Sequence, residues 1–366
     1  CRLEIPRSRA PPDVWCRTMR SLNLLSVFCF VSLSAACQPR KPPAPVAPVS
    51  SVSPELKAAL EKAIACKYEE GAFDKECEGI KAWEANTELA NAQLLELLPS
   101  DDAKVRTLVA ERLAVQLTAD NADKESLTVF LDVAEKEKVD SIAKTLAGGA
   151  AKIDLGKFGL LDRGIAIAKA HGVHDYQETY ANGLKSESEP DKVVAYAGDL
   201  AKSEDKALRN AALSMYGNLK ATRPEAACTG MEALRADKDA SLAQLATSEL
   251  AREGKCAPQH DGILTSLEEM KLPKNPAAAE PFVGVVVESI CQNEGKTPAQ
   301  RDRSLALAKQ VSETAAIHAD TRVHTLAAVL ACDPKGGPAF LKKLSKDKDA
   351  TVSARAKTLL EGISKK

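Results

Sequence analysis

The chain has 366 residues, of which 28% are charged and only 4% are aromatic, and its formal net charge is −1. Acidic and basic residues are interspersed, so the chain lacks the basic patch that nucleic-acid-binding proteins need, and we expect no nucleic-acid partner. The scarcity of aromatic side chains also argues against a groove that stacks bases or sugars.

Residues 19–36 have the pattern of an export signal. Met19-Arg20 supplies a positive start, an apolar run follows from Leu22 to Leu33, and Ser34-Ala35-Ala36 places small residues before Cys37. The run is shorter than the roughly 20 apolar residues of a transmembrane helix. The arginine-rich residues 1–18 have no place in such a signal. We interpret them as translated from a start upstream of the true one, with a cytoplasmic extension as the alternative.

The end of this leader resembles the lipobox of bacterial lipoproteins. Ala35-Ala36-Cys37 matches its last three positions, whereas Ser34 stands where leucine is usual. The resemblance implies acylation of Cys37 and a firm membrane anchor. By the same resemblance, Gln38 after the cysteine implies the outer membrane, with the protein facing the periplasm. Ordinary signal cleavage after Ala36 is the alternative, because Ser34-Ala35-Ala36 also fits the small-x-small rule.

Residues 37–52 predict a tether that follows the lipidated cysteine. Five prolines lie between Gln38 and Val52, and such a stretch favours the extended polyproline-II conformation, at about 3.1 Å per residue. The segment would therefore hold the following domain away from the membrane. A proline-rich ligand for a peptide-binding module is the alternative reading.

Residues 53–366 predict an all-α domain. Apolar residues recur at spacings of three and four, and Ser53-Pro54 is typical of a helix start. Glycines and prolines interrupt the pattern every dozen or so residues, and no segment alternates apolar and polar residues long enough for a strand. We therefore expect about sixteen helices and no sheet.

A motif recurs in this domain: an acidic residue, an apolar residue at +3, often a base at +4, a small residue at +7 and an apolar residue near +11. The acid is expected to cap a helix and the apolar positions to form its buried stripe. Copies begin at Asp102, Asp205, Asp239, Asp320 and Asp349, with a weaker one at Asp191.

These copies resemble HEAT repeats, whose second helix often opens with Asp-x-x-Val-Arg. The resemblance covers about half of residues 102–364 and implies an α-solenoid of antiparallel helical hairpins that binds protein partners. Tetratricopeptide-like arrays and an irregular helical bundle are the alternatives.

Six cysteines follow Cys37, an even number that suits an exported protein with disulfides. Only near neighbours in the chain can meet in a solenoid, and the two members of each pair fall at a shared helix end. The sequence therefore predicts the disulfides Cys66–Cys77, Cys228–Cys256 and Cys291–Cys332. The absence of a Cys-x-x-Cys spacing disfavours a metal site, and free buried cysteines are the remaining alternative.

No motif predicts catalysis, a metal site or a cofactor. His171 and His174 form the only close histidine pair, but Gly172 separates them, so we expect a solvated loop. Gly148-Gly149 and Gly336-Gly337 lack the lysine and hydroxyl of a phosphate loop, so they predict turns or helix breaks.

The sequence therefore predicts an envelope lipoprotein that is no enzyme and that acts as an interaction scaffold for another envelope protein. A structural or assembly factor of the envelope and, less favoured, an enzyme with dispersed site residues are the alternatives.

Overall fold

The computed structural model describes residues 52–86, 89–185, 187–272, 274 and 281–364. The leader, Cys37 and all of the tether except Val52 lie outside these residues. Nearly all of the regular secondary structure in the described residues is helical, which confirms the all-α prediction.

Within the described residues the chain forms eighteen α-helices, two 3₁₀ helices and two short strands. In chain order they are α1 (Pro54–Ile64), β1 (Tyr68–Glu69), β2 (Ala72–Phe73), α2 (Glu78–Ala85), α3 (Asn91–Leu97), α4 (Ala103–Gln116), α5 (Lys124–Lys136), α6 (Asp140–Ala151), η1 (Leu155–Phe158), α7 (Leu161–Ala170), α8 (Tyr176–Gly183), α9 (Pro190–Leu200), α10 (Lys206–Leu219), α11 (Pro224–Leu234), α12 (Ala240–Arg252), η2 (Gly254–Gln259), α13 (His260–Glu269), α14 (Phe282–Gln292), α15 (Pro298–Glu313), α16 (Ala319–Cys332), α17 (Gly337–Leu344) and α18 (Ala350–Ser364).

The expectation of no sheet is wrong between α1 and α2. There β1 and β2 pair antiparallel, with Tyr68 opposite Phe73. The turn between them places Glu70 and Gly71 at positive φ, a conformation that glycine adopts without strain. Alternation over only two residues a strand is too short a signal to detect in a sequence.

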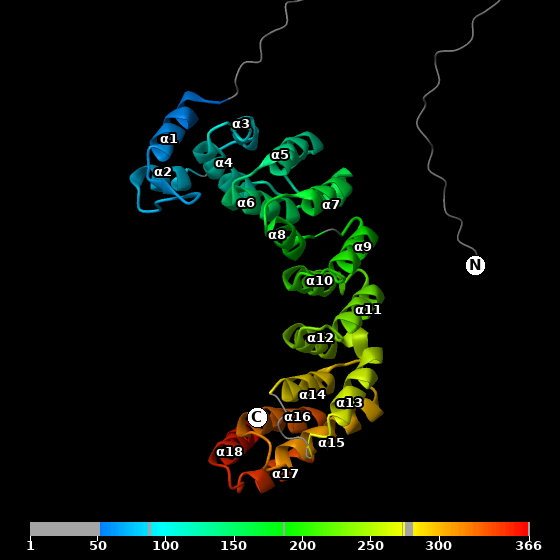
Figure 1. Ribbon diagram of the computed structural model, residues 1–366. Helices are drawn as coiled ribbons and strands as arrows, with labels where there is room; N and C mark the ends of the chain where they lie inside the picture. Colours follow the sequence, from blue (N-terminus) through cyan, green and yellow to red (C-terminus); the bar gives the residue numbers. More distant parts are fainter. Residues whose placement is uncertain (1–51, 87–88, 186, 273, 275–280, 365–366) are drawn as a thin grey trace, which may run out of the picture. The chain divides into compact units, whose positions relative to one another are not determined.

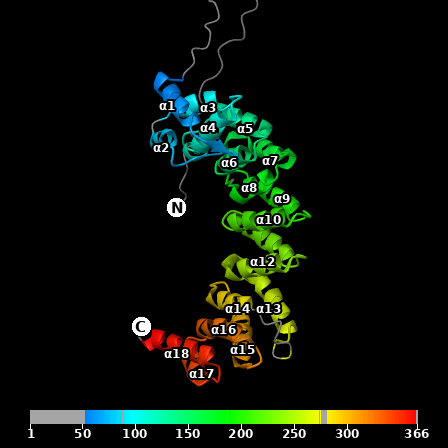
Figure 2. The ribbon, with the colours of Figure 1, turned by 60° about the vertical axis from the view of Figure 1, so that its left-hand side comes forward.

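The helices from α4 onward pack in two layers. Each even-numbered helix, from α4 to α18, packs against the even-numbered helix before and after it, and these helices form the even layer. The odd-numbered helices lie alongside them as the odd layer; Figures 1 and 2 show α9 and α11 beside α8, α10 and α12. Every substantial helix–helix contact joins elements no more than three positions apart, as expected of successive hairpins.

The caps of the recurring motif and the burial of its +7 position are confirmed for four copies, whereas Leu208 at +3 and Leu360 at +11 are only half-buried. Asp102, Asp205, Asp239 and Asp349 each accept backbone N–H hydrogen bonds in the first turn of α4, α10, α12 and α18. Their +7 residues are completely buried, so the motif does mark the face that packs on the neighbouring hairpins.

The copy at Asp320 is placed two residues too late. His318, not Asp320, caps α16, because its Nδ1 accepts the N–H of Asp320. The positions +3, +4, +7 and +11 counted from His318 are Thr321, Arg322, Thr325 and Val329, and all four are buried. The weaker copy is also out of register, since Asp191 lies inside α9, which begins at Pro190. The sequence alone favoured the acids because an acidic cap is commoner than a histidine cap.

The base at +4 links successive hairpins of the even layer. Arg209 of α10 donates from Nε and Nη2 to the two carboxylate oxygens of Asp237, at 2.7 and 3.0 Å, just before α12 begins. Its Nη1 donates to the carbonyls of Ser203 and Glu204. Both side chains of the pair are about 95% buried. The hydrogen bonds from Arg209 hold the pKa of Asp237 below its usual value although burial opposes ionisation.

The same bridge occurs twice more in the described chain. Arg106 of α4 binds Glu137 before α6, and Arg322 of α16 binds Asp347 before α18. Burial alone would raise the pKa of Glu137, but hydrogen bonds from Arg106 and two backbone amides lower it. A bidentate arginine fixes both the distance and the angle between the elements it joins, so these bridges set the spacing of the hairpins.

Exposed ion pairs link the odd-numbered helices in a similar way. Each joins a helix to the next odd-numbered one: Arg163–Asp132, Lys192–Asp162, Arg223–Asp191, Arg303–Glu268 and Lys343–Glu313. Such pairs each contribute little in water and weaken as salt is added. The odd layer is therefore held more loosely than the even layer.

Helix α18 closes the even layer with a polar outer face. At the +4 position, where α4, α10 and α16 carry arginine, it has Ser353, which donates to the carbonyl of Ser345. At +8, where α16 buries Leu326, it has the exposed Lys357. This face of α18 is therefore more polar than the corresponding face of α16.

We predict that the buried bridge matters far more than the exposed ones. Arg209→Met leaves Asp237 buried and unpaired, so the free energy of unfolding should fall by roughly 3 kcal/mol. Arg223→Met removes the exposed ion pair with Asp191 and should change the free energy of unfolding little. Urea denaturation of both variants under oxidising conditions measures this, and equal losses would contradict the assigned role of the bridge.

Buried His260 predicts acid sensitivity. Its Nε2 lies 3.1 Å from the carbonyl of Leu250, and burial lowers its pKa below the usual value although this hydrogen bond opposes the shift. The unfolded chain therefore binds a proton more readily, and stability should fall as the pH drops below about 6.5, by at most about 1.4 kcal/mol per pH unit.

Thermal unfolding between pH 7.5 and pH 5.5 measures this dependence. The slope below pH 6.5 should shrink in His260→Gln and persist in His174→Gln, because the side chain of His174 is exposed. An unchanged slope in His260→Gln would assign the acid sensitivity to other groups.

Candidate binding groove

Three disulfides tie neighbouring elements together, and they are the three pairs that the sequence predicts. The Cα atoms lie 6.1 Å apart in Cys66–Cys77, 5.4 Å in Cys228–Cys256 and 4.9 Å in Cys291–Cys332. The first joins α1 to α2 around the β-hairpin, where the sequence predicts a simple helical turn. The second fixes α11 to η2 and the third fixes α14 to α16.

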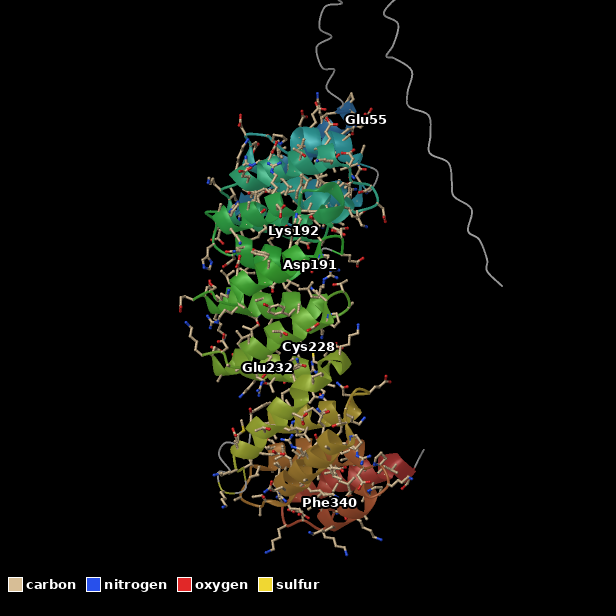
Figure 3. All side chains as sticks on the ribbon, turned by 90° about the vertical axis from the view of Figure 1, so that its right-hand side faces the viewer. Glu55, Asp191, Lys192, Cys228, Glu232 and Phe340 are labelled. Carbon is tan, nitrogen blue, oxygen red and sulfur yellow. A yellow bond between two sulfur atoms is a disulfide. The ribbon has the colours of Figure 1, made fainter. Side chains whose placement is uncertain are left out.

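A groove lies between α9 and α11. Its volume is about 1040 Å³. The walls carry mainly small side chains, among them Gly198 of α9 and Ala226, Gly230 and Ala233 of α11, and the floor is Tyr216 of α10. Figure 3 views the odd layer, with Asp191 and Lys192 marking α9 and Cys228 and Glu232 marking α11. The Cys228–Cys256 disulfide thus anchors one wall.

The floor of the groove depends on a glycine. A Cβ atom at Gly230 would overlap the ring of Tyr216, so only glycine lets α11 lie across this ring. Tyr216 is 5% exposed, and burial raises its pKa, so its hydroxyl stays protonated. Within the described residues no hydrogen bond reaches this hydroxyl, which lines the groove beside Gly198.

Ion pairs close both ends of the groove. At one end Arg223, which precedes α11, donates from Nε and Nη2 to both carboxylate oxygens of Asp191 in α9, at 2.6 and 3.1 Å. The hydrogen bonds from Arg223 lower the pKa of Asp191. At the other end Lys238, after α11, pairs with Glu204, after α9, beside the buried Arg209–Asp237 bridge. The first pair joins the N-terminal ends of α9 and α11, and the second joins the segments that follow their C-terminal ends, so the two helices run parallel.

A smaller groove of about 540 Å³ lies between α3 and α5 and shares part of this construction. It is lined by Ser100, Arg106, Glu137 and Lys138, as the larger groove is lined by Ser203, Arg209, Asp237 and Lys238. The repeated bridge therefore creates a similar hollow twice in the described array. Of these two grooves, the one between α9 and α11 has an aromatic floor, Tyr216, beneath a glycine, Gly230.

The histidine pair lies at the start of the loop after α7. Nε2 of His171 lies 2.9 Å from the carbonyl of Ala134, its Nδ1 accepts the N–H of Val173, and its ring stacks on Tyr176. His171 thus has a packing role, whereas His174 is exposed. In the described ranges no group of three or more histidine, cysteine or acidic side chains is arranged to hold a metal ion.

Two expectations about paired glycines are tested by the helices. The prediction of a break at Gly148-Gly149 is wrong, because both residues lie inside α6 and Gly149 packs against Ala114 and Phe130. Gly336-Gly337 does mark a break, as it opens α17.

The residues that build the groove were not assigned by sequence reasoning. The motif copy that begins at Asp205 predicts Arg209 only as its base at +4 and Tyr216 only as its apolar residue at +11. A signal exists: the arginine is followed 25 to 31 residues later by an acid and a lysine, as in Glu137-Lys138, Asp237-Lys238 and Asp347-Lys348. This spacing is one hairpin, the distance to the start of the next even-numbered helix.

No protein-family model matches the chain, and no curated protein matches it either. The class that the described residues define is therefore structural: an all-α, disulfide-linked series of helical hairpins. None of the described helices is both long and apolar enough to cross a membrane.

We predict that Gly230→Ala destabilises the protein, because the added methyl forces the Tyr216 ring or α11 to move. The loss should be about 1 to 3 kcal/mol, the usual effect of overpacking. Gly217→Ala is the matched control, since a Cβ there meets open space on α10. This substitution should raise the free energy of unfolding by about 0.5 to 1 kcal/mol, because alanine favours the helix over glycine. Chemical denaturation decides the matter, and a stabilised Gly230→Ala variant would contradict the packing.

Proposed function

We propose that this protein is an envelope lipoprotein that acts as an interaction scaffold and holds a protein partner in the groove between α9 and α11. The groove is the observation that carries the proposal. It is concave, about 1040 Å³ in volume and lined by small and apolar side chains with charged ends, which suits a segment of another protein.

The disulfides support an extracytoplasmic location. All six cysteines after Cys37 are paired, and disulfides form and persist in oxidising compartments such as the periplasm. Cys37 lies outside the described residues, and the six later cysteines pair with one another, so the proposal assigns the Cys37 thiol to acylation. The proposal therefore retains the lipid anchor, the proline-rich tether and an outer-membrane location facing the periplasm.

The HEAT-like character of the array belongs to the same proposal. The aspartate caps, the buried +7 residues and the recurring arginine bridges support it, because each repeats at the same place of a helix. An array of this kind offers a surface along successive hairpins, and the proposal assigns it binding and no catalysis.

The anchor has a direct test. Cys37→Ser, expressed with the native leader in a bacterium, should release the protein from the membrane fraction and abolish its labelling by radioactive palmitate. Cys29→Ser, within the leader, is the control and should leave both unchanged. Sedimentation of the Cys37→Ser protein with membranes after a salt wash would exclude the lipid anchor.

A further inference from the structure

The chemistry of the groove between α9 and α11 is not the same at its two ends. Lys202 lies where α9 ends and Glu225 lies in the first turn of α11, and both line the groove. Neither forms an ion pair within the described part of the chain, whereas the other charges around them are paired across the groove. One end therefore presents an unpaired cation and the other an unpaired anion.

The middle of the groove allows a close approach and offers one hydrogen-bonding group. Ala226, Gly230 and Ala233 follow one another along α11 at spacings of four and three, so they share one face of that helix. Opposite them lie Gly198 and Ala201 of α9. The hydroxyl of Tyr216 lies between these walls without a partner in the described residues, in a side chain that is 5% exposed. A ligand group that hydrogen-bonds to it would pair a polar atom that has no partner among the described residues.

The walls favour a helical occupant over an extended one. Both walls are α-helices, so their backbone N–H and C=O groups are already bonded along most of the groove. An extended peptide would leave its own backbone groups unpaired against these walls, whereas a helix satisfies its backbone internally. Helix α11 has 11 residues, or about 16 Å, which accommodates three turns of a second helix.

We propose that the groove binds an amphipathic α-helix of the partner protein, antiparallel to α9 and α11. The acidic first turn of this helix lies beside Lys202, its basic last turn lies beside Glu225, and a serine, threonine or asparagine in its middle reaches Tyr216. Helix dipoles favour this direction, because the guest's amino end then meets the carboxyl ends of α9 and α11. The proposal rests on the scaffold function and names the chemistry of its partner.

The test uses the full chain purified in detergent and two displayed libraries of 15-residue helices. Both libraries carry alanine, serine, threonine, asparagine or leucine on one face. One has acids in the first turn and bases in the last, and the other has these charges reversed. The first library should be enriched at least tenfold over the second. Equal enrichment, or none in the first library, overturns the proposal.

Three variants test whether the selected helix binds in the groove between α9 and α11. Thr229→Trp fills the groove and should weaken binding at least tenfold, whereas Thr358→Trp on α18 should not. The two threonines are matched, since each is exposed and donates its hydroxyl to the carbonyl four residues earlier. Tyr216→Phe removes one hydrogen bond and should weaken binding about fivefold.

These outcomes are independent of the lipid anchor. Binding that survives Thr229→Trp overturns the site even if Cys37→Ser releases the protein from membranes. Conversely, helix binding with these sensitivities stands even if the anchor fails, because the detergent-purified chain is assayed away from any membrane.

Discussion

The buried arginine bridge is the interaction on which the arrangement of the array depends. A hairpin made mostly of alanine and leucine can slide on its neighbour, because such side chains are small and similar to one another. Arg209 removes that freedom by binding both oxygens of Asp237 and two carbonyls of the preceding loop at once. A planar, five-donor group does this better than a lysine, which is a single point of charge. The bridge therefore fixes both the register and the tilt of α10 against α12.

The groove follows from that constraint. The arginine bridge holds the even layer, whereas the odd layer relies on exposed ion pairs such as Arg223–Asp191 at the edge. Helices α9 and α11 meet at their ends through charge, and small residues between those ends leave space above Tyr216. The disulfide from Cys228 to η2 then keeps α11 from closing that space. A rigid inner layer and a loosely linked outer layer together produce a preformed hollow, and a preformed site lowers the entropy that a ligand's binding costs.

The disulfides contribute where packing is weakest. With few aromatic side chains, each hairpin buries modest apolar area, and a cross-link compensates by limiting the unfolded chain. Cys66–Cys77 secures α1 and α2, the first of the described helices, and Cys291–Cys332 joins α14 to α16. Stability of this kind lasts only as long as the disulfides remain oxidised.

The amino-acid sequence by itself determined the helical class, the caps at Asp102, Asp205, Asp239 and Asp349, and the cysteine pairs. These are local properties: a cap involves its own first turn, and each cysteine pair spans at most 41 residues. Only the tertiary structure decided the register at His318, the β-hairpin at Tyr68–Phe73 and the partners of Arg209 and Arg322, because these depend on which loop another helix brings near. The same holds for the groove. In the sequence, nothing distinguishes Gly230 from other residues of a helix. Only the structure shows that the Tyr216 ring of a different helix occupies the space where a side chain at Gly230 would be.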